Sequence, residues 1–121
     1  MKYILLIYDD EKNRGKMSDA ERKQLFSDYG QFTEQIKSSG HYVTGAPLQP
    51  VSTATSVRVR DGKQLVIDGP FAETREQLGG YYLIEAKNLD EATGIAARVP
   101  SARMGTIEVR PLMEAAVPAS A

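Results

Sequence analysis

The chain has 121 residues, of which 41% are hydrophobic and 26% are charged, and its formal net charge is −1. These values predict one globular domain that buries roughly 65% of the surface of the extended chain when it folds. Cysteine is absent and there is one histidine, which excludes disulfides, thiolate metal centres, cysteine nucleophiles and multi-histidine metal sites within one chain. We expect no metal and no cofactor. The balanced charge gives no sign of nucleic-acid binding.

The N-terminal segment is apolar over too short a stretch to act as a membrane span or a secretory signal. We therefore expect a cytoplasmic protein with no membrane partner. Residues 2–8 are predicted to form a strand that is apolar on both faces, which is typical of a central strand covered on both sides. Residues 9–17 are predicted to form a polar loop.

A long amphipathic helix is predicted to follow this loop. It begins with the capping box of Ser18 and Glu21 and ends at Gly40, which has the position of a C-terminal cap. Its apolar residues recur at spacings of three and four, as a stripe on one helix face requires. They are Leu25, Tyr29, Phe32 and Ile36.

The second half of the chain is predicted to contain mainly strands. Residues 56–60 and 63–68 flank Asp61-Gly62, a pair that favours a type I′ hairpin turn. A second helix is predicted over 89–99, capped by Asn88 and stopped by Pro100. The remaining segments are predicted as a strand over 41–45, a connection over 68–80 with a possible helical turn, a strand over 81–86, a strand over 106–110, and a loose tail over 113–121.

The predicted order is β-α-β-hairpin-β-α-β, which fits an α+β fold with a ferredoxin-like split β-α-β sheet. Both helices should then lie on one face of the sheet. The strands over 2–8 and 81–86 are nevertheless apolar on both faces, so the second face also needs a cover. The simplest cover is the same face of another copy, and we expect a symmetric homodimer with a pocket possible between the two sheets.

At Asp68-Gly69-Pro70-Phe71, continued by the run Ala72 to Gly80, the sequence resembles the DGPF-domain type of the YCII-related family. Residues 59–62 and 107–111 also resemble this family, and the resemblance covers about residues 1–112, which we take as the domain. It implies a dimeric α+β barrel and says little about activity, because such members are largely uncharacterised. It also suggests a link to extracytoplasmic-function sigma factors, whose genes often neighbour those of the family.

Some YCII-like members carry a histidine in the first long helix and an aspartate before a proline that follows the second, a pair proposed as a catalytic dyad. Here the helix predicted over 18–39 contains no histidine, and Val99 precedes Pro100. The resemblance therefore supplies no dyad. Any enzyme chemistry in this chain needs other groups.

Asp68 is the first candidate for a catalytic residue, because it ends a strand next to a Gly-Pro turn. A carboxylate placed there in an apolar pocket could be a general base. The alternative is a structural role in which the carboxylate accepts hydrogen bonds from the following turn.

Six further residues form the predicted ligand-binding set: Phe71, Glu73, Arg75, Tyr8, Tyr82 and His41. Glu73 and Arg75 could hold a polar ligand, or could pair with each other in a solvated turn. The tyrosines suit a pocket wall, and equally a core or dimer interface. His41 could change charge near neutral pH, or could be an ordinary surface side chain. No metal site is predicted.

Three functions fit these observations. The first is a small homodimer that binds a small polar-aromatic or acidic molecule near the loop 68–71. The second is a cofactor-free enzyme, oxygenase-like or isomerase-like, with Asp68 as general base, which rests on analogy between folds. The third is a regulatory interaction module linked to a sigma factor.

Overall fold

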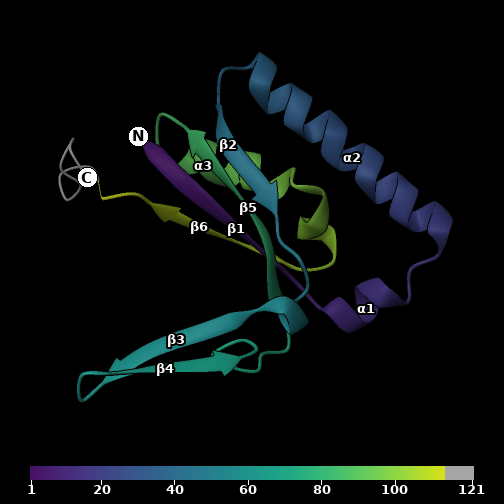
Figure 1. Cartoon of the computed structure of the whole chain (residues 1–121). Coiled ribbons are helices and arrows are strands. Elements are labelled where there is room, and N and C mark those ends of the chain that lie inside the picture. The colour runs from purple at the N-terminus through teal and green to yellow at the C-terminus, as the bar shows by residue number, and fades with distance from the viewer. Residues whose placement is uncertain (114–121) are drawn as a thin grey trace.

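A computed structural model describes residues 1–113 of the chain (Figure 1). Residues 114–121, which make up most of the predicted tail, lie outside the described part. The strands are β1 (Lys2–Asp9), β2 (Tyr42–Pro47), β3 (Thr55–Arg60), β4 (Lys63–Asp68), β5 (Gln77–Glu85) and β6 (Thr106–Pro111). The helices are α1 (Glu11–Gly15), α2 (Asp19–Ser38) and α3 (Leu89–Ala97), with short 3-10 turns η1 (Val51–Thr53) and η2 (Pro100–Arg103).

Four of the strands form one sheet in the order β2-β5-β1-β6, and every neighbouring pair is antiparallel. This is the strand order of a split β-α-β, ferredoxin-like fold, with α2 connecting β1 to β2 and α3 connecting β5 to β6. The predicted α+β class is confirmed. The strands β3 and β4 pair with each other in a separate two-stranded sheet.

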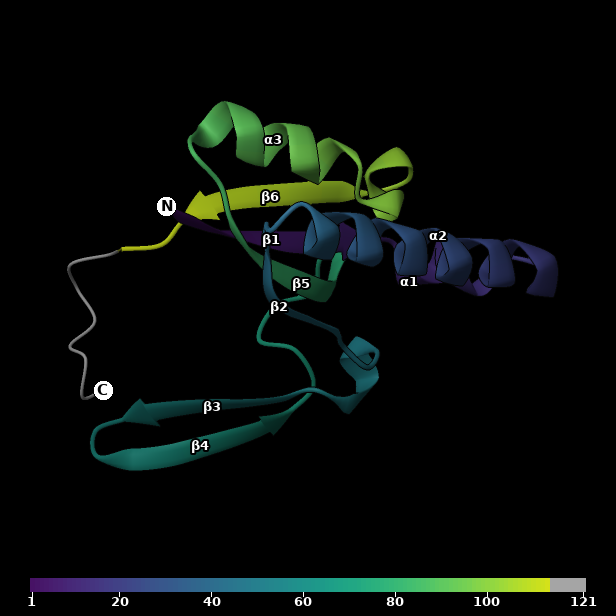
Figure 2. The ribbon, with the colours of Figure 1, turned by 90° about the horizontal axis from the view of Figure 1, so that it is seen from above.

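The hydrophobic core lies on one face of the four-stranded sheet. Successive residues of β1 alternate between buried and half-buried, because strand side chains point to opposite faces in turn. Leu5 of β1 and Ile84 of β5 pack in one cluster with Ile36 of α2 and Ile95 of α3. Both long helices therefore cover the same face, as predicted, and they lie side by side over the strands in Figure 2.

The opposite face of the sheet is apolar and lies away from these two helices. It carries Ile4, Leu6, Tyr81 and Leu83, all half-buried, which alternate with the core residues along β1 and β5. The register places Ile4 opposite Leu83 and Leu6 opposite Tyr81, so the four side chains are neighbours. Neither α2 nor α3 covers this surface, which we call the open face.

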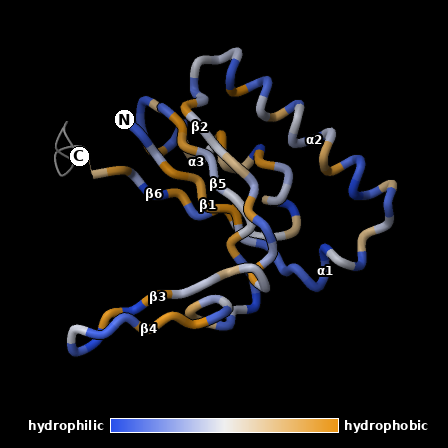
Figure 3. The backbone as a smooth tube through the Cα atoms, in the orientation of Figure 1, coloured by the Kyte–Doolittle hydropathy of each residue, from blue (hydrophilic) through white to orange (hydrophobic). Residues whose placement is uncertain are grey.

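The β3–β4 hairpin confirms the turn that was predicted from Asp61-Gly62. Both residues have positive φ, 52° and 73°, as a type I′ turn requires. The hairpin extends away from the sheet (Figure 1), and orange apolar segments run along it in Figure 3. Its exposed large hydrophobic residues have exposed fractions of 44% to 62% and are Val57, Val59, Leu65, Val66 and Ile67.

Some predicted boundaries were wrong. The strand predicted over 41–45 is β2, which continues to Pro47. The segment 9–17 contains the short helix α1, because the Asp10 carboxylate accepts the Lys12 backbone N–H and caps its first turn. The strand β5 begins at Gln77 and not at residue 81. Within this strand, position 80 suits a glycine because the β2 backbone passes close to it. A Cβ at Gly80 would lie 3.1 Å from the Ala46 carbonyl oxygen.

Among residues 1–113, no helix has the length and apolar character that crossing a membrane requires.

Candidate functional site

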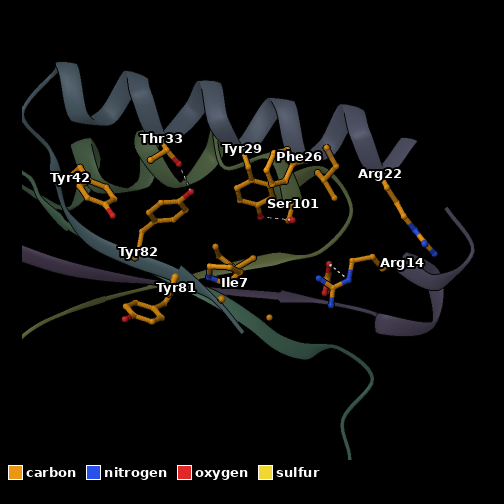
Figure 4. Close-up of a pocket in the computed structure, with 17 residues that line it drawn as sticks. Ile7, Arg14, Arg22, Phe26, Tyr29, Thr33, Tyr42, Tyr81, Tyr82 and Ser101 are labelled. Atoms are coloured by element: carbon orange, nitrogen blue, oxygen red, sulfur yellow. Dashed lines mark hydrogen bonds and ion pairs between the residues drawn. The ribbon is translucent and has the colours of Figure 1, made fainter. Parts of the chain in front are cut away.

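A cavity of about 440 Å³ lies between α2 and the helix-facing side of the sheet (Figure 4). Its volume falls within the range of sites that hold small organic molecules. Aromatic side chains form much of its wall: Phe26 and Tyr29 come from α2, Tyr42 from β2 and Tyr82 from β5. Such rings offer large apolar contact areas to a planar ligand.

Tyr82 stands at the centre of this aromatic wall. Its ring meets Phe32 edge-on, with centroids 5.3 Å apart, and meets Tyr42 in the same way at 6.3 Å. The ring also lies against Gly45 of β2, where a Cβ would come within 2.7 Å of Tyr82 Cδ1. A glycine at position 45 is therefore needed to seat the Tyr82 ring on the sheet.

Two hydrogen bonds tie α2 to the opposite wall of the cavity. The Tyr29 hydroxyl donates to Ser101 Oγ on η2 at 2.6 Å, and Thr33 Oγ1 and Tyr82 Oη are 2.7 Å apart. Burial raises the pKa of both tyrosine hydroxyls above the ordinary value of 10.0. Both groups therefore stay protonated and neutral throughout the physiological pH range.

The cavity also contains a charge pair whose carboxylate is buried. Asp9, the last residue of β1, is only 4% exposed, and its Oδ2 lies 3.7 Å from Arg14 Nε of α1. Within residues 1–113, the other carboxylate oxygen, Oδ1, is buried and has no hydrogen-bond partner. Burial is the main cause that raises the pKa of Asp9, and Arg14 opposes it. A buried carboxylate oxygen without a donor is costly, and such groups are concentrated at functional sites.

Glycines lie on both sides of Asp9. The β1–β5 register shifts between Ile7 and Tyr8, so that Gly79 is an extra residue in β5 and forms a bulge. On the other side, a Cβ at Gly105 would lie 3.0 Å from both Cα and Cβ of Asp9 and would collide with the Tyr8 carbonyl oxygen. The chain can therefore approach Asp9 this closely at position 105 only because that residue has no side chain.

Of the residues predicted from the sequence, Tyr82 alone lines the cavity. Asp68 ends β4 as an exposed side chain, and Phe71, Glu73 and Arg75 follow it in an exposed loop. The roles predicted for these loop residues stay predictions.

Two other residues of the predicted ligand-binding set also lie outside the cavity lining. Tyr8 is half-buried on the open face, where Thr106 of β6 is its register partner. The His41 ring contacts Ser39 Oγ at 2.7 Å and Glu91 Oε1 at 3.3 Å.

Sequence reasoning missed Asp9, Arg14 and Ser101. Asp9 and Arg14 fall in a polar run that has the composition of a solvated loop, and Ser101 follows the proline that was expected only to stop a helix. One signal was present: a charged residue directly follows a strand that is apolar on both faces. Such a residue sits at the edge of the core.

Comparisons with known proteins agree with this architecture. The family model of the YCII-related domain matches residues 1–116. The uncharacterised protein R00369 of Rhizobium meliloti (strain 1021) is 38% identical over 114 residues, which cover 93% of this chain and 92% of that protein.

A solved structure shares the fold. It is the 5-chloro-2-hydroxyhydroquinone dehydrochlorinase TftG of Burkholderia phenoliruptrix AC1100 in complex with 2,5-dihydroxybenzoquinone. The TM-score is 0.53 at 14% identity, and the match covers 93% of this chain and 94% of that chain. The family that the Asp-Gly-Pro-Phe segment predicted is confirmed, and the chain belongs to the YCII-related family.

Proposed function

We propose that this protein binds a small, planar, polar-aromatic molecule in the cavity between α2 and the sheet. One observation carries the proposal: aromatic side chains and the charge pair of Asp9 and Arg14 line the same cavity of about 440 Å³. Apolar walls with a few convergent polar groups are the usual composition of small-molecule sites. The class of ligand is the one predicted from the sequence, and the proposed site lies apart from the Asp68 loop.

The fold relative TftG suggests a first ligand to try, because it is described in complex with 2,5-dihydroxybenzoquinone. We expect this compound to bind the purified protein in isothermal titration calorimetry. Leu25 of α2 lines the cavity and is half-buried, so a Leu25→Trp substitution fills the space from the helix side. The variant should bind at least tenfold more weakly, because the larger ring occupies the volume that the ligand needs.

Lys23→Trp is the matched control, because Lys23 is exposed on the same helix and does not line the cavity. It should leave the dissociation constant unchanged. Far-UV circular dichroism checks that both variants fold. Equal affinities of the Leu25→Trp and Lys23→Trp variants would contradict binding in this cavity.

We also propose that two copies associate through the open face. Its four half-buried apolar side chains and the exposed apolar residues of the β3–β4 hairpin support this proposal. Apolar surfaces of this kind are typical of interfaces between proteins. The predicted cytoplasmic location and the predicted sigma-factor link stay predictions.

A further inference from the structure

The charged side chains of the cavity are mainly basic. Among residues 1–113, the lining contains two arginines, Arg14 and Arg22, and one carboxylate, that of Asp9. The Asp9 carboxylate is buried and lies beside Arg14 Nε. The arginines outnumber it whether it is ionised or neutral, so the lining carries a net positive charge in either state.

Arg22 faces the cavity because of its position along α2. Residues 22, 26, 29 and 33 recur at spacings of four, three and four, which places them on one face of a helix. All four of these residues line the cavity, and the last three carry a ring or a hydroxyl group. The stripe that α2 presents to the cavity therefore begins with a guanidinium group.

Both arginines can be reached and have donors left for a ligand. Arg14 is 35% exposed, and Arg22 is an exposed residue. Arg14 meets Asp9 through Nε, which leaves its two terminal nitrogens for another acceptor. Arg22 uses Nη2 to donate to the Gly15 carbonyl oxygen at 3.1 Å, and a guanidinium group has five N–H donors in all.

Three further carboxylates lie near Asp9, and none of them lines the cavity. Each accepts a hydrogen bond from a part of the chain that is also outside the lining. A ligand in the cavity would therefore contact the arginines and not these carboxylates. They are Asp10, Glu11 and Glu76.

A carboxylate is the ligand group that matches this end of the cavity. The planar guanidinium offers its donors in a fork that fits a carboxylate. Because both arginines are partly or largely exposed, a carboxylate beside them keeps part of its hydration and avoids most of the cost of burying a charge. Figure 4 shows Arg14 and Arg22 at the same end of the cavity, away from Tyr42. A ring among the aromatic side chains can thus direct an attached carboxylate toward the arginines.

We infer that Arg14 and Arg22 form a carboxylate subsite, in which the acidic substituent of a cavity-bound aromatic ring accepts hydrogen bonds from both guanidinium groups. This inference rests on the proposed function, because the ring must first bind in the cavity. It narrows the ligand class from polar-aromatic molecules in general to aromatic acids that bind as anions.

The test compares 2-naphthoate with 2-naphthamide, which share a ring and differ in the charge of the substituent at pH 7. Equilibrium dialysis measures both, because both are fluorescent. The wild-type protein should bind 2-naphthoate roughly tenfold more tightly, since hydrogen bonds to a charged acceptor stabilise a complex by that factor or more. Raising the sodium chloride concentration from about 0.01 M to about 1 M should reduce this preference, because salt screens charges at an exposed site.

Arg22→Gln removes one of the two charges at an exposed position, so the fold should tolerate it. It should lower the preference for 2-naphthoate by roughly threefold or more and retain the affinity for 2-naphthamide. Arg14→Gln removes the other charge and should act in the same way. Lys23→Gln is the matched control, because it removes the same charge from an exposed neighbour on α2 that does not line the cavity, and it should keep the preference. Far-UV circular dichroism of each variant checks its fold.

The outcomes separate the two proposals. If wild-type protein binds both probes equally, if a folded arginine variant keeps the full preference, or if Lys23→Gln lowers it as much, the carboxylate subsite is wrong and the aromatic cavity stands. If neither probe binds, both proposals are wrong. If the arginine variants that fold lose the preference while Lys23→Gln keeps it, the subsite is established.

Discussion

Asp9 is a buried carboxylate that is incompletely paired. Its carboxylate is buried beside one arginine that is 3.7 Å away and 35% exposed, and one of its oxygens lacks a donor among residues 1–113. Burial raises its pKa above the ordinary 3.8, Arg14 lowers it, and the nearby charges of Glu11, Glu76 and Asp10 raise it. The charged form is therefore the less favourable one in the folded protein.

This pKa shift predicts how the stability depends on pH. A carboxyl group whose pKa is higher in the folded protein stabilises the fold fully below its unfolded pKa. That contribution is lost as the pH rises from about 3.8 through the folded pKa. Asp9→Asn lacks this contribution at every pH. The free energy of unfolding of Asp9→Asn minus that of wild type should therefore increase between pH 4 and pH 7.

Urea denaturation of both proteins at these two pH values measures that difference. The comparison cancels the titration of all other groups that the substitution leaves unchanged. A difference that stays constant or decreases with pH would show that the Asp9 pKa is not raised. Asp68→Asn is the matched substitution for comparison, because Asp68 is an exposed aspartate that also ends a strand.

The contrast between Asp9 and Asp68 shows what the sequence can reveal about a site. Each aspartate ends a strand, and the local sequence favoured Asp68 because a Gly-Pro turn follows it. The close packing around Asp9 depends instead on Gly105, which lies far from Asp9 in the sequence and close to it in the fold. The wall residue Tyr82 was predicted, because an aromatic residue on a central strand must face either the core or a pocket.

At the scale of elements, the position of α2 over the sheet determines the shape of the cavity. Its first turn is fixed by the predicted capping box, in which Ser18 Oγ accepts the Glu21 N–H and the Glu21 carboxylate accepts the Ser18 N–H. Further along, the bond from the Tyr29 hydroxyl to Ser101 joins α2 to η2. Ser101 is 3% exposed, so its hydroxyl depends on this partner.

Tyr29→Phe tests this connection. It removes the Tyr29 hydroxyl and leaves the buried Ser101 oxygen without its donor, which should lower the free energy of unfolding by about 1–3 kcal/mol. Urea denaturation measures the loss. Tyr29→Phe in a Ser101→Ala background, where neither partner remains, should cost less than it costs in wild type. Equal costs in both backgrounds would show that the bond does not join the two elements.

Some elements could be predicted from local sequence, and others could not. The hairpin and the capping box depend on a few adjacent residues, Asp61-Gly62 and Ser18 with Glu21, and both were predicted correctly. The start of β5 depends on pairing with β1 and β2, which local composition does not reveal. The run containing Gly79 and Gly80 has the composition of a loop, and it is part of a strand because β5 pairs with β1 and β2.

At the scale of the whole molecule, two apolar surfaces lack a partner among residues 1–113. One is the open face of the sheet, and the other is the hairpin, whose exposed apolar residues include Val57 and Ile67. Figures 1 and 2 show the hairpin extending from the end of the sheet as a separate arm. Homodimers usually have twofold symmetry. In the proposed dimer, the open face and the hairpin of one copy would both contact the other copy.

The proposed dimer predicts a mass that depends on a single residue of the open face. Analytical ultracentrifugation at micromolar concentration should give twice the chain mass of 13.3 kDa for wild type. Leu83→Lys places a charge at the centre of the open face, on a half-buried side chain, and should shift the protein to monomers. Leu89→Lys, at a 53% exposed position of α3, makes the same substitution on the helix side and should leave the dimer intact. Far-UV circular dichroism checks that both variants fold. A monomeric wild type, or a Leu83→Lys variant that remains dimeric, would show that the open face is not the interface.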